Sequence, residues 1–183
     1  ELEYRVRSNQ PDRDMTDTLV SQVAVAAVKF AILKQDTRKD IIFDPETSLS
    51  FEGDSGPYLQ YTYARCQSLL RKFQVSSFPP APDAGGRAGK LQEAGNFEVM
   101  ELDRILYRFP EVVELAAREY APHHVANYLL EVGRMFNSWY GNTQIIVEDD
   151  PAGTTARLAR VAGVAQIIKN GLWVLGIEAP ESM

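Results

Sequence analysis

Apolar residues recur at helical spacing along most of the chain. Between Ser55 and Lys72 the sequence carries a stripe at intervals of three or four residues, formed by Leu59, Tyr63, Cys66, Leu70 and Phe73. Such a stripe is typical of a helix that packs on a core. Ser55 fits the N-cap position, and Pro57 fits the first turn, where a missing backbone N–H costs nothing. The sequence therefore predicts a helix over about residues 55–73.

The same spacing predicts further helices, at about 16–34, 99–110, 110–120, 122–141 and 153–175. One helical turn is expected at 46–49, and the helix at 110–120 is expected to turn Tyr120 inward. The apolar run Ile41-Ile42-Phe43 has strand character and is closed by Asp44-Pro45. No helix is expected in the polar and charged residues 1–14.

The pattern breaks once in the middle of the chain. Residues 74–96 contain Pro79-Pro80 and Gly85-Gly86 without periodicity, which is typical of a flexible loop. The fold class expected is all-α, a helical bundle from about residue 55 onward with a short, mostly helical segment before it. Because the chain begins at Glu1 without a methionine, we expect it to be truncated at its N-terminus.

Composition restricts the function classes. The 183 residues are 45% hydrophobic and 24% charged, enough for one domain with a core, or one domain and a fragment of another. The single cysteine, Cys66, excludes a disulfide framework. The formal net charge of −6 disfavours a non-specific nucleic-acid coat but allows a local basic face. Without an apolar run of membrane-spanning length or a signal-peptide pattern, a cytoplasmic protein with no membrane contact is expected.

Candidate catalytic and metal-binding residues are few. The only histidines, His123 and His124, are adjacent, and adjacent helical residues point to different faces, so they make a poor metal pair. The sequence has no phosphate-binding P-loop and no dinucleotide-binding glycine pattern. We therefore assign no catalytic residue, no metal ligand and no cofactor to this chain.

Several segments resemble the arginyl-tRNA synthetases. The stretch Ser50-Phe51-Glu52-Gly53-Asp54-Ser55-Gly56-Pro57-Tyr58-Leu59-Gln60-Tyr61, with Ala64-Arg65 after it, is similar to the segment that opens their all-helical anticodon-binding domain. Residues 108–113 resemble the family's RFPEVV element, and residues 136–140 its FN-x-x-Y element. The ending at 175–183 resembles the family's C-terminus, although Ser182 stands where the family usually has arginine. The resemblance covers about residues 19–73 and 97–183.

The resemblance implies a division of the chain and a parent enzyme. Residues 1–54 would be the tail of a class I synthetase's catalytic part, and 55–183 its DALR-type anticodon-binding domain. The parent would attach arginine to its tRNA using ATP and Mg²⁺. Neither the HIGH-type nor the KMSKS-type element of such enzymes occurs here, so this chain is expected to be inactive by itself. Its expected partners are the anticodon stem-loop of arginine tRNA and the catalytic core of the same polypeptide, in a monomer.

An RNA reader needs flat side chains that stack on splayed bases. The resemblance places Tyr140 and the terminal Met183 near the anticodon loop. Tyr140 could instead be a rim tyrosine of the core, with Trp139 pointing inward, and Met183 could be a frayed end. Asn137 could bond a base edge or the local backbone.

A second face of the helix at 55–73 supplies the remaining candidates. Tyr58 and Tyr61 could stack on bases, or could wedge this helix against the catalytic core. Arg65, Lys72 and Arg157 could contact phosphates, or could be solvated charges. The alternative function is a non-enzymatic helical adaptor that kept the anticodon-domain fold and lost RNA binding, which the acidic net charge favours.

Overall fold

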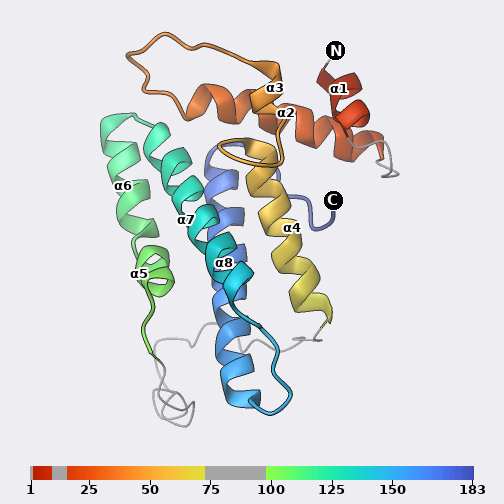
Figure 1. Ribbon diagram of the computed structural model, residues 1–183. Coiled ribbons are helices and arrows are strands. Elements are labelled where there is room, and N and C mark those ends of the chain that lie inside the picture. Colours follow the sequence, from red (N-terminus) through yellow and green to blue (C-terminus); the bar gives the residue numbers. More distant parts are fainter. Residues whose placement is uncertain (1, 10–15, 73–97) are drawn as a thin grey trace.

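The computed structural model describes residues 2–9, 16–72 and 98–183, and within these ranges it is all-helical, as the sequence predicts. The helices (Figure 1) are α1 (Leu2–Asn9), α2 (Asp17–Leu33), α3 (Pro45–Ser48), α4 (Gly56–Lys72), α5 (Glu101–Tyr107), α6 (Phe109–Glu119), α7 (His123–Asn142) and α8 (Pro151–Val174). The loop predicted at 74–96 and Phe73, the last residue of the predicted α4 stripe, lie outside the described residues.

The bundle is organised around α8. Helices α4, α7 and α5 pack against it, and α6 packs on α7 at the outer side (Figure 1). The predicted stripe of α4 is confirmed at Leu59, Tyr63 and Cys66, each at most 1% exposed, while Leu70 is only partly buried. Burial raises the pKa of the Cys66 thiol to about 12, which fits a small core residue.

Helix α2 lies across one end of the bundle and joins two cores (Figure 1). Thr16 caps it, its hydroxyl oxygen accepting a hydrogen bond from the backbone N–H of Leu19 at 3.3 Å. Ala26 and Phe30 belong to the main core, whereas other α2 residues form a smaller cluster with Val6 of α1 and Leu49. The division predicted between residues 54 and 55 falls between α3 and α4. Helix α2 packs both on α3, which precedes this division, and on α4, which follows it.

The chain after α8 is held on α2 and α4. Gly176 adopts the left-handed conformation, with φ of 67°, and the N–H of Ile177 bonds the carbonyl of Leu172 at 2.8 Å, which closes the helix as predicted. The Gln60 amide donates to the Glu178 carbonyl at 2.8 Å, and Arg71 donates to the Glu181 carbonyl at 3.0 Å. The C-terminal segment is therefore anchored at two points along α4.

Three local predictions are wrong. Residues 41–43 form no strand, because no neighbouring strand of the described chain offers them a pairing edge, and all three side chains are exposed. Tyr120 does not point inward: α6 ends at Glu119, and Tyr120 is its left-handed cap, 87% exposed. Residues 1–14 contain helix α1, although the sequence predicts no helix there. Among the described side chains of α1 only Val6 is buried, so the sequence shows no apolar stripe that would indicate this helix.

Candidate functional site

The candidate site begins at the N-terminus of α4. The Ser55 hydroxyl oxygen accepts a hydrogen bond from the backbone N–H of Tyr58 at 3.0 Å, so Ser55 caps the helix as predicted. The same hydroxyl donates to the carbonyl of Ser50, which ties the preceding loop to the cap. This start fixes the register of α4 and turns Tyr58, Tyr61 and Arg65 away from the buried stripe, where each is only partly buried.

Helices α4 and α7 approach closely beside these side chains. Gly133 of α7 has no side chain, and a Cβ there would lie 3.1 Å from the ring of Tyr58. One turn further along α7, the Asn137 amide nitrogen donates to the Tyr58 hydroxyl at 2.8 Å and to the Thr62 hydroxyl at 3.3 Å. Tyr58 therefore packs from α4 against α7, and its ring sets the distance between the two helices.

Arg65 bridges the two helices at the surface. Its guanidinium carbon lies 5.0 Å from the ring centre of Tyr61 and 5.4 Å from that of Tyr140, both within cation–π range. The guanidinium also donates to the Asn137 side-chain oxygen at 3.3 Å and to the Tyr61 hydroxyl at 3.4 Å. We call Tyr58, Tyr61, Arg65, Asn137 and Tyr140 the tyrosine–arginine cluster. Five of the eight predicted binding residues thus lie together.

Tyr140 belongs to the core as well as to the surface. Its ring stacks on buried Phe136, with ring centres 5.8 Å apart and an interplanar angle of 26°. Trp139 packs on the same Phe136 at 6.1 Å, so the expected contrast between an inward Trp139 and a rim Tyr140 does not hold: both are partly buried. Tyr140 is accordingly a supported ring, fixed by Phe136 and Arg65.

Met183 lies in a different neighbourhood. It is partly buried against the cluster formed by Val6, Val20, Val23, Ala24, Ala27 and Leu49. Phe51 packs on that same cluster and also meets Tyr61 edge-on, with ring centres 6.3 Å apart. Met183 is therefore placed by packing and is not a frayed end, and Phe51 connects its surroundings with the tyrosine–arginine cluster.

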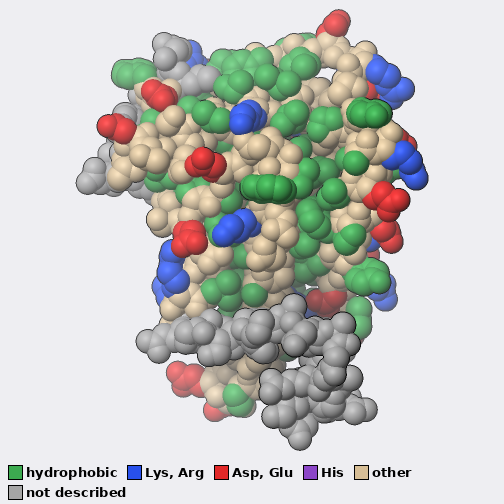
Figure 2. Space-filling model, turned by 180° about the vertical axis from the view of Figure 1, so that it is seen from behind, with side chains coloured by type: hydrophobic (Ala, Val, Ile, Leu, Met, Phe, Trp, Pro, Cys, Tyr) green, Lys and Arg blue, Asp and Glu red, His purple; other side chains and the backbone are tan. Residues whose placement is uncertain are grey.

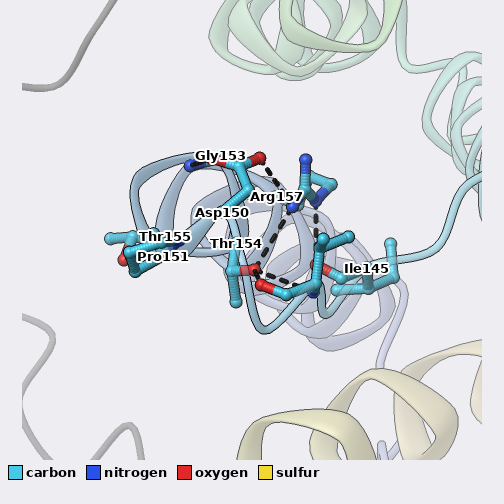
Figure 3. Close-up of polar contacts among 8 residues, drawn as sticks. Ile145, Asp150, Pro151, Gly153, Thr154, Thr155 and Arg157 are labelled. Carbon is cyan, nitrogen blue, oxygen red and sulfur yellow. Dashed lines mark hydrogen bonds and ion pairs between the residues drawn. The ribbon is translucent and has the colours of Figure 1, made fainter.

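Arg157 is placed to hold a loop. Figure 3 shows it folded back from α8 toward the loop that precedes the helix. It donates to the Ile145 carbonyl at 2.8 Å, to Asp150 at 3.1 Å and to the Thr154 hydroxyl at 3.2 Å, and its side chain is only 18% exposed. Asp150 caps α8 by accepting from the N–H of Gly153 at 2.9 Å. These contacts commit Arg157 to the loop, whereas Lys72 at the end of α4 is exposed.

One face of the described molecule carries charges of both signs. Figure 2 shows that the face hidden in Figure 1 carries separate Lys and Arg side chains among Asp, Glu and many hydrophobic ones, without a continuous basic area.

In residues 2–9, 16–72 and 98–183, no three His, Cys, Asp or Glu side chains are grouped so that they could hold a metal ion. None of the described helices is long and apolar enough to cross a membrane.

Sequence reasoning did not single out Thr62, Phe136 as the support of Tyr140, or the link through Phe51. Thr62 is 1% exposed and lies one turn after Tyr58, a spacing that suggests a shared face but not a hydrogen bond to α7.

Chemically, the cluster offers a supported tyrosine ring beside a guanidinium with further donors. Such a pair can stack on a base and bond its acceptors.

Comparisons with known proteins identify the family to which the chain is similar. The family model for the DALR anticodon binding domain matches residues 59–183. Arginine–tRNA ligase 1 of Bacillus thuringiensis subsp. konkukian is 36% identical, with 97% of this chain and 30% of that protein covered. The arginine–tRNA ligase of Thermococcus kodakarensis is 39% identical, with 100% of this chain and 28% of that protein covered.

The fold is also similar to that of a solved structure. Arginyl-tRNA synthetase of Thermus thermophilus matches 100% of this chain and 30% of its own, with 33% identity and a TM-score of 0.76. The chain thus spans about 30% of the length of the relatives it matches. The matched family model covers everything from the second turn of α4 to Met183, including the whole tyrosine–arginine cluster except Tyr58. The chain belongs to the DALR anticodon-binding domain family.

Proposed function

We propose that this chain recognises the anticodon arm of arginine tRNA as one part of an arginine–tRNA ligase. The observation that carries the proposal is the tyrosine–arginine cluster. It holds a partly buried Tyr140 ring and the Arg65 guanidinium side by side, within a chain of the anticodon-binding family. Aromatic rings stack on unpaired bases, and a guanidinium bonds acceptor-rich base edges or phosphates.

The remaining assignments concern the parent enzyme, and the resemblance to arginyl-tRNA synthetases implies them. A parent enzyme would join arginine to tRNA with ATP and Mg²⁺ in a catalytic part outside this chain, and the chain would contact that part within the same polypeptide. We expect the parent to be a cytoplasmic monomer, and this segment to contribute recognition without chemistry or a cofactor of its own. Residues 1–54 would then be the end of the catalytic part.

One observation favours the alternative of a helical adaptor that does not bind RNA. Arg157 is one of three cations predicted to contact phosphate, but its guanidinium is hydrogen-bonded to Ile145 and Asp150 of the preceding loop. The net charge of −6 points in the same direction. Arg65 and Lys72 remain for phosphate or base contacts, so an RNA reader of this kind depends on few charges.

Binding of a labelled arginine-tRNA anticodon stem-loop, followed by fluorescence anisotropy, tests the proposal. We expect saturable binding that competes poorly with a hairpin of the same stem and an unrelated loop. With few phosphate contacts, affinity should fall with salt on a slope of roughly two to four released counterions. Equal affinity for both hairpins with a steeper slope would indicate non-specific binding, and no binding would favour the adaptor.

A further inference from the structure

Both polar atoms of the Asn137 side chain are hydrogen-bonded inside the protein. Its amide nitrogen donates to the Tyr58 hydroxyl at 2.8 Å and to the Thr62 hydroxyl at 3.3 Å. Its oxygen accepts from Arg65 at 3.3 Å. Because an amide has two N–H donors, both donors of Asn137 are already engaged inside the protein. A base edge that needed a donor from Asn137 would have to displace one of these bonds.

The direction of the amide is fixed from both ends. The Thr62 hydroxyl donates its only hydrogen to the Tyr58 carbonyl at 2.9 Å, so toward Asn137 it can only accept. The amide nitrogen must therefore face Thr62. Arg65 carries only donors, so the side of Asn137 that it meets must be the oxygen. The two requirements agree, and they leave one amide orientation.

This arrangement determines where the Arg65 guanidinium lies. Asn137 holds it at one end and the Tyr61 hydroxyl at the other, between the rings of Tyr61 and Tyr140. A guanidinium has five N–H donors, so those that remain keep fixed directions beside the Tyr140 ring. We propose that Asn137 is a positioning residue that acts on bound RNA through Arg65. The proposal rests on the proposed RNA-binding function.

A double-mutant cycle separates positioning from direct contact. Asn137→Ala should weaken binding of the arginine-tRNA stem-loop about tenfold when Arg65 is present, and less than about twofold in an Arg65→Met background, because the lost interaction is shared. Thr62→Val, which removes one of the two contacts that fix the amide orientation and keeps Asn137, should give a smaller loss that also vanishes with Arg65→Met. Asn170→Ala is the matched control: its exposed amide is paired with Gln166 on α8, and affinity should not change.

A second measurement needs no RNA. The NMR signals of the Arg65 guanidinium should be shifted upfield by the rings of Tyr61 and Tyr140 in the free chain, and Arg65→Met assigns them by their loss. Asn137→Ala should move these signals toward those of a solvated arginine. Unchanged signals would overturn the positioning role.

The outcomes distinguish the two proposals. Equal losses of affinity for Asn137→Ala in both backgrounds would mean that Asn137 contacts RNA itself, and would overturn the inference. A lower melting temperature with unchanged affinity of the folded chain would reduce Asn137 to a packing residue, and would also overturn it. If the wild-type chain does not bind RNA, the proposed function fails, and the Arg65 signals alone decide whether Asn137 positions the guanidinium.

Discussion

Replacing Tyr140 with alanine should lower both stability and RNA affinity. The ring is partly buried and stacks on Phe136 at 5.8 Å. A fully buried aromatic residue costs about 3–5 kcal/mol when truncated, and an aromatic pair contributes about 0.5–1.5 kcal/mol of such a loss. For a half-buried ring we expect about 2 kcal/mol, which in a chain of this length corresponds to a Tm roughly 4–8 °C lower.

The affinity of the variant should fall independently of its stability. Loss of one stacking ring weakens single-stranded nucleic-acid binding by about 1–3 kcal/mol. Tyr140→Phe keeps the ring, and the Tyr140 hydroxyl has no hydrogen-bond partner among the described residues, so both quantities should change little. Tyr107→Ala is the matched control, because that tyrosine is 83% exposed on α5, away from α4.

Thermal melts followed by circular dichroism give the stability, and anisotropy titrations well below the lowest Tm give the affinity of the folded chain. From the apolar stripe alone, with Val132, Phe136 and Trp139 inward, Tyr140→Ala would cause no loss of stability. The stacking of Tyr140 on Phe136 in the structure is the reason that we expect a loss. Unchanged affinity of folded Tyr140→Ala for the arginine-tRNA stem-loop would refute the stacking role and favour the adaptor.

Three further outcomes can be checked on the same preparation. In a sample free of host synthetase the chain should show no arginine-dependent ATP–pyrophosphate exchange, and exchange above a blank would contradict its non-catalytic role. The N–H of Gly153, and then Arg157, hold the pKa of Asp150 below its usual range. Its contribution to stability should therefore be present above about pH 4 and lost as the pH falls toward the lowered pKa, so urea midpoints of wild type and Asp150→Asn should converge in acid. Burial raises the pKa of Cys66 to about 12, so iodoacetamide at pH 8 should modify it only after unfolding; rapid labelling of the native chain would contradict this placement.

The helices were predictable because their patterns are long and their ends carry specific residues. Ser55, Pro57 and Gly176 each act at a helix end as expected, and the stripe of α4 faces the core. Short segments were less predictable. Residues 41–43 have the composition of a strand, but strand formation depends on a partner elsewhere in the chain, which periodicity cannot reveal.

The site was predictable as a set of residues but not as a set of roles. Tyr61 and Arg65 share a helix face by spacing, and Tyr140 joins them only through the close contact of α4 with α7. That contact depends on Gly133, whose importance is not evident without the position of Tyr58. Arg157 shows the converse case: its spacing on α8 is that of an exposed cation, and the loop that folds back onto it decides otherwise.

Transplanting the anticodon loop tests the central claim most directly. Arginine tRNA and an unrelated tRNA are prepared with their own loops and with the two loops exchanged, and the affinity of the chain for all four is measured at one salt concentration. The cluster offers stacking and base-edge contacts. The unrelated tRNA that carries the arginine loop should therefore bind tightly, and the arginine tRNA that carries the unrelated loop should bind weakly. Affinity that stays with the tRNA body, or is equal for all four, would contradict the account.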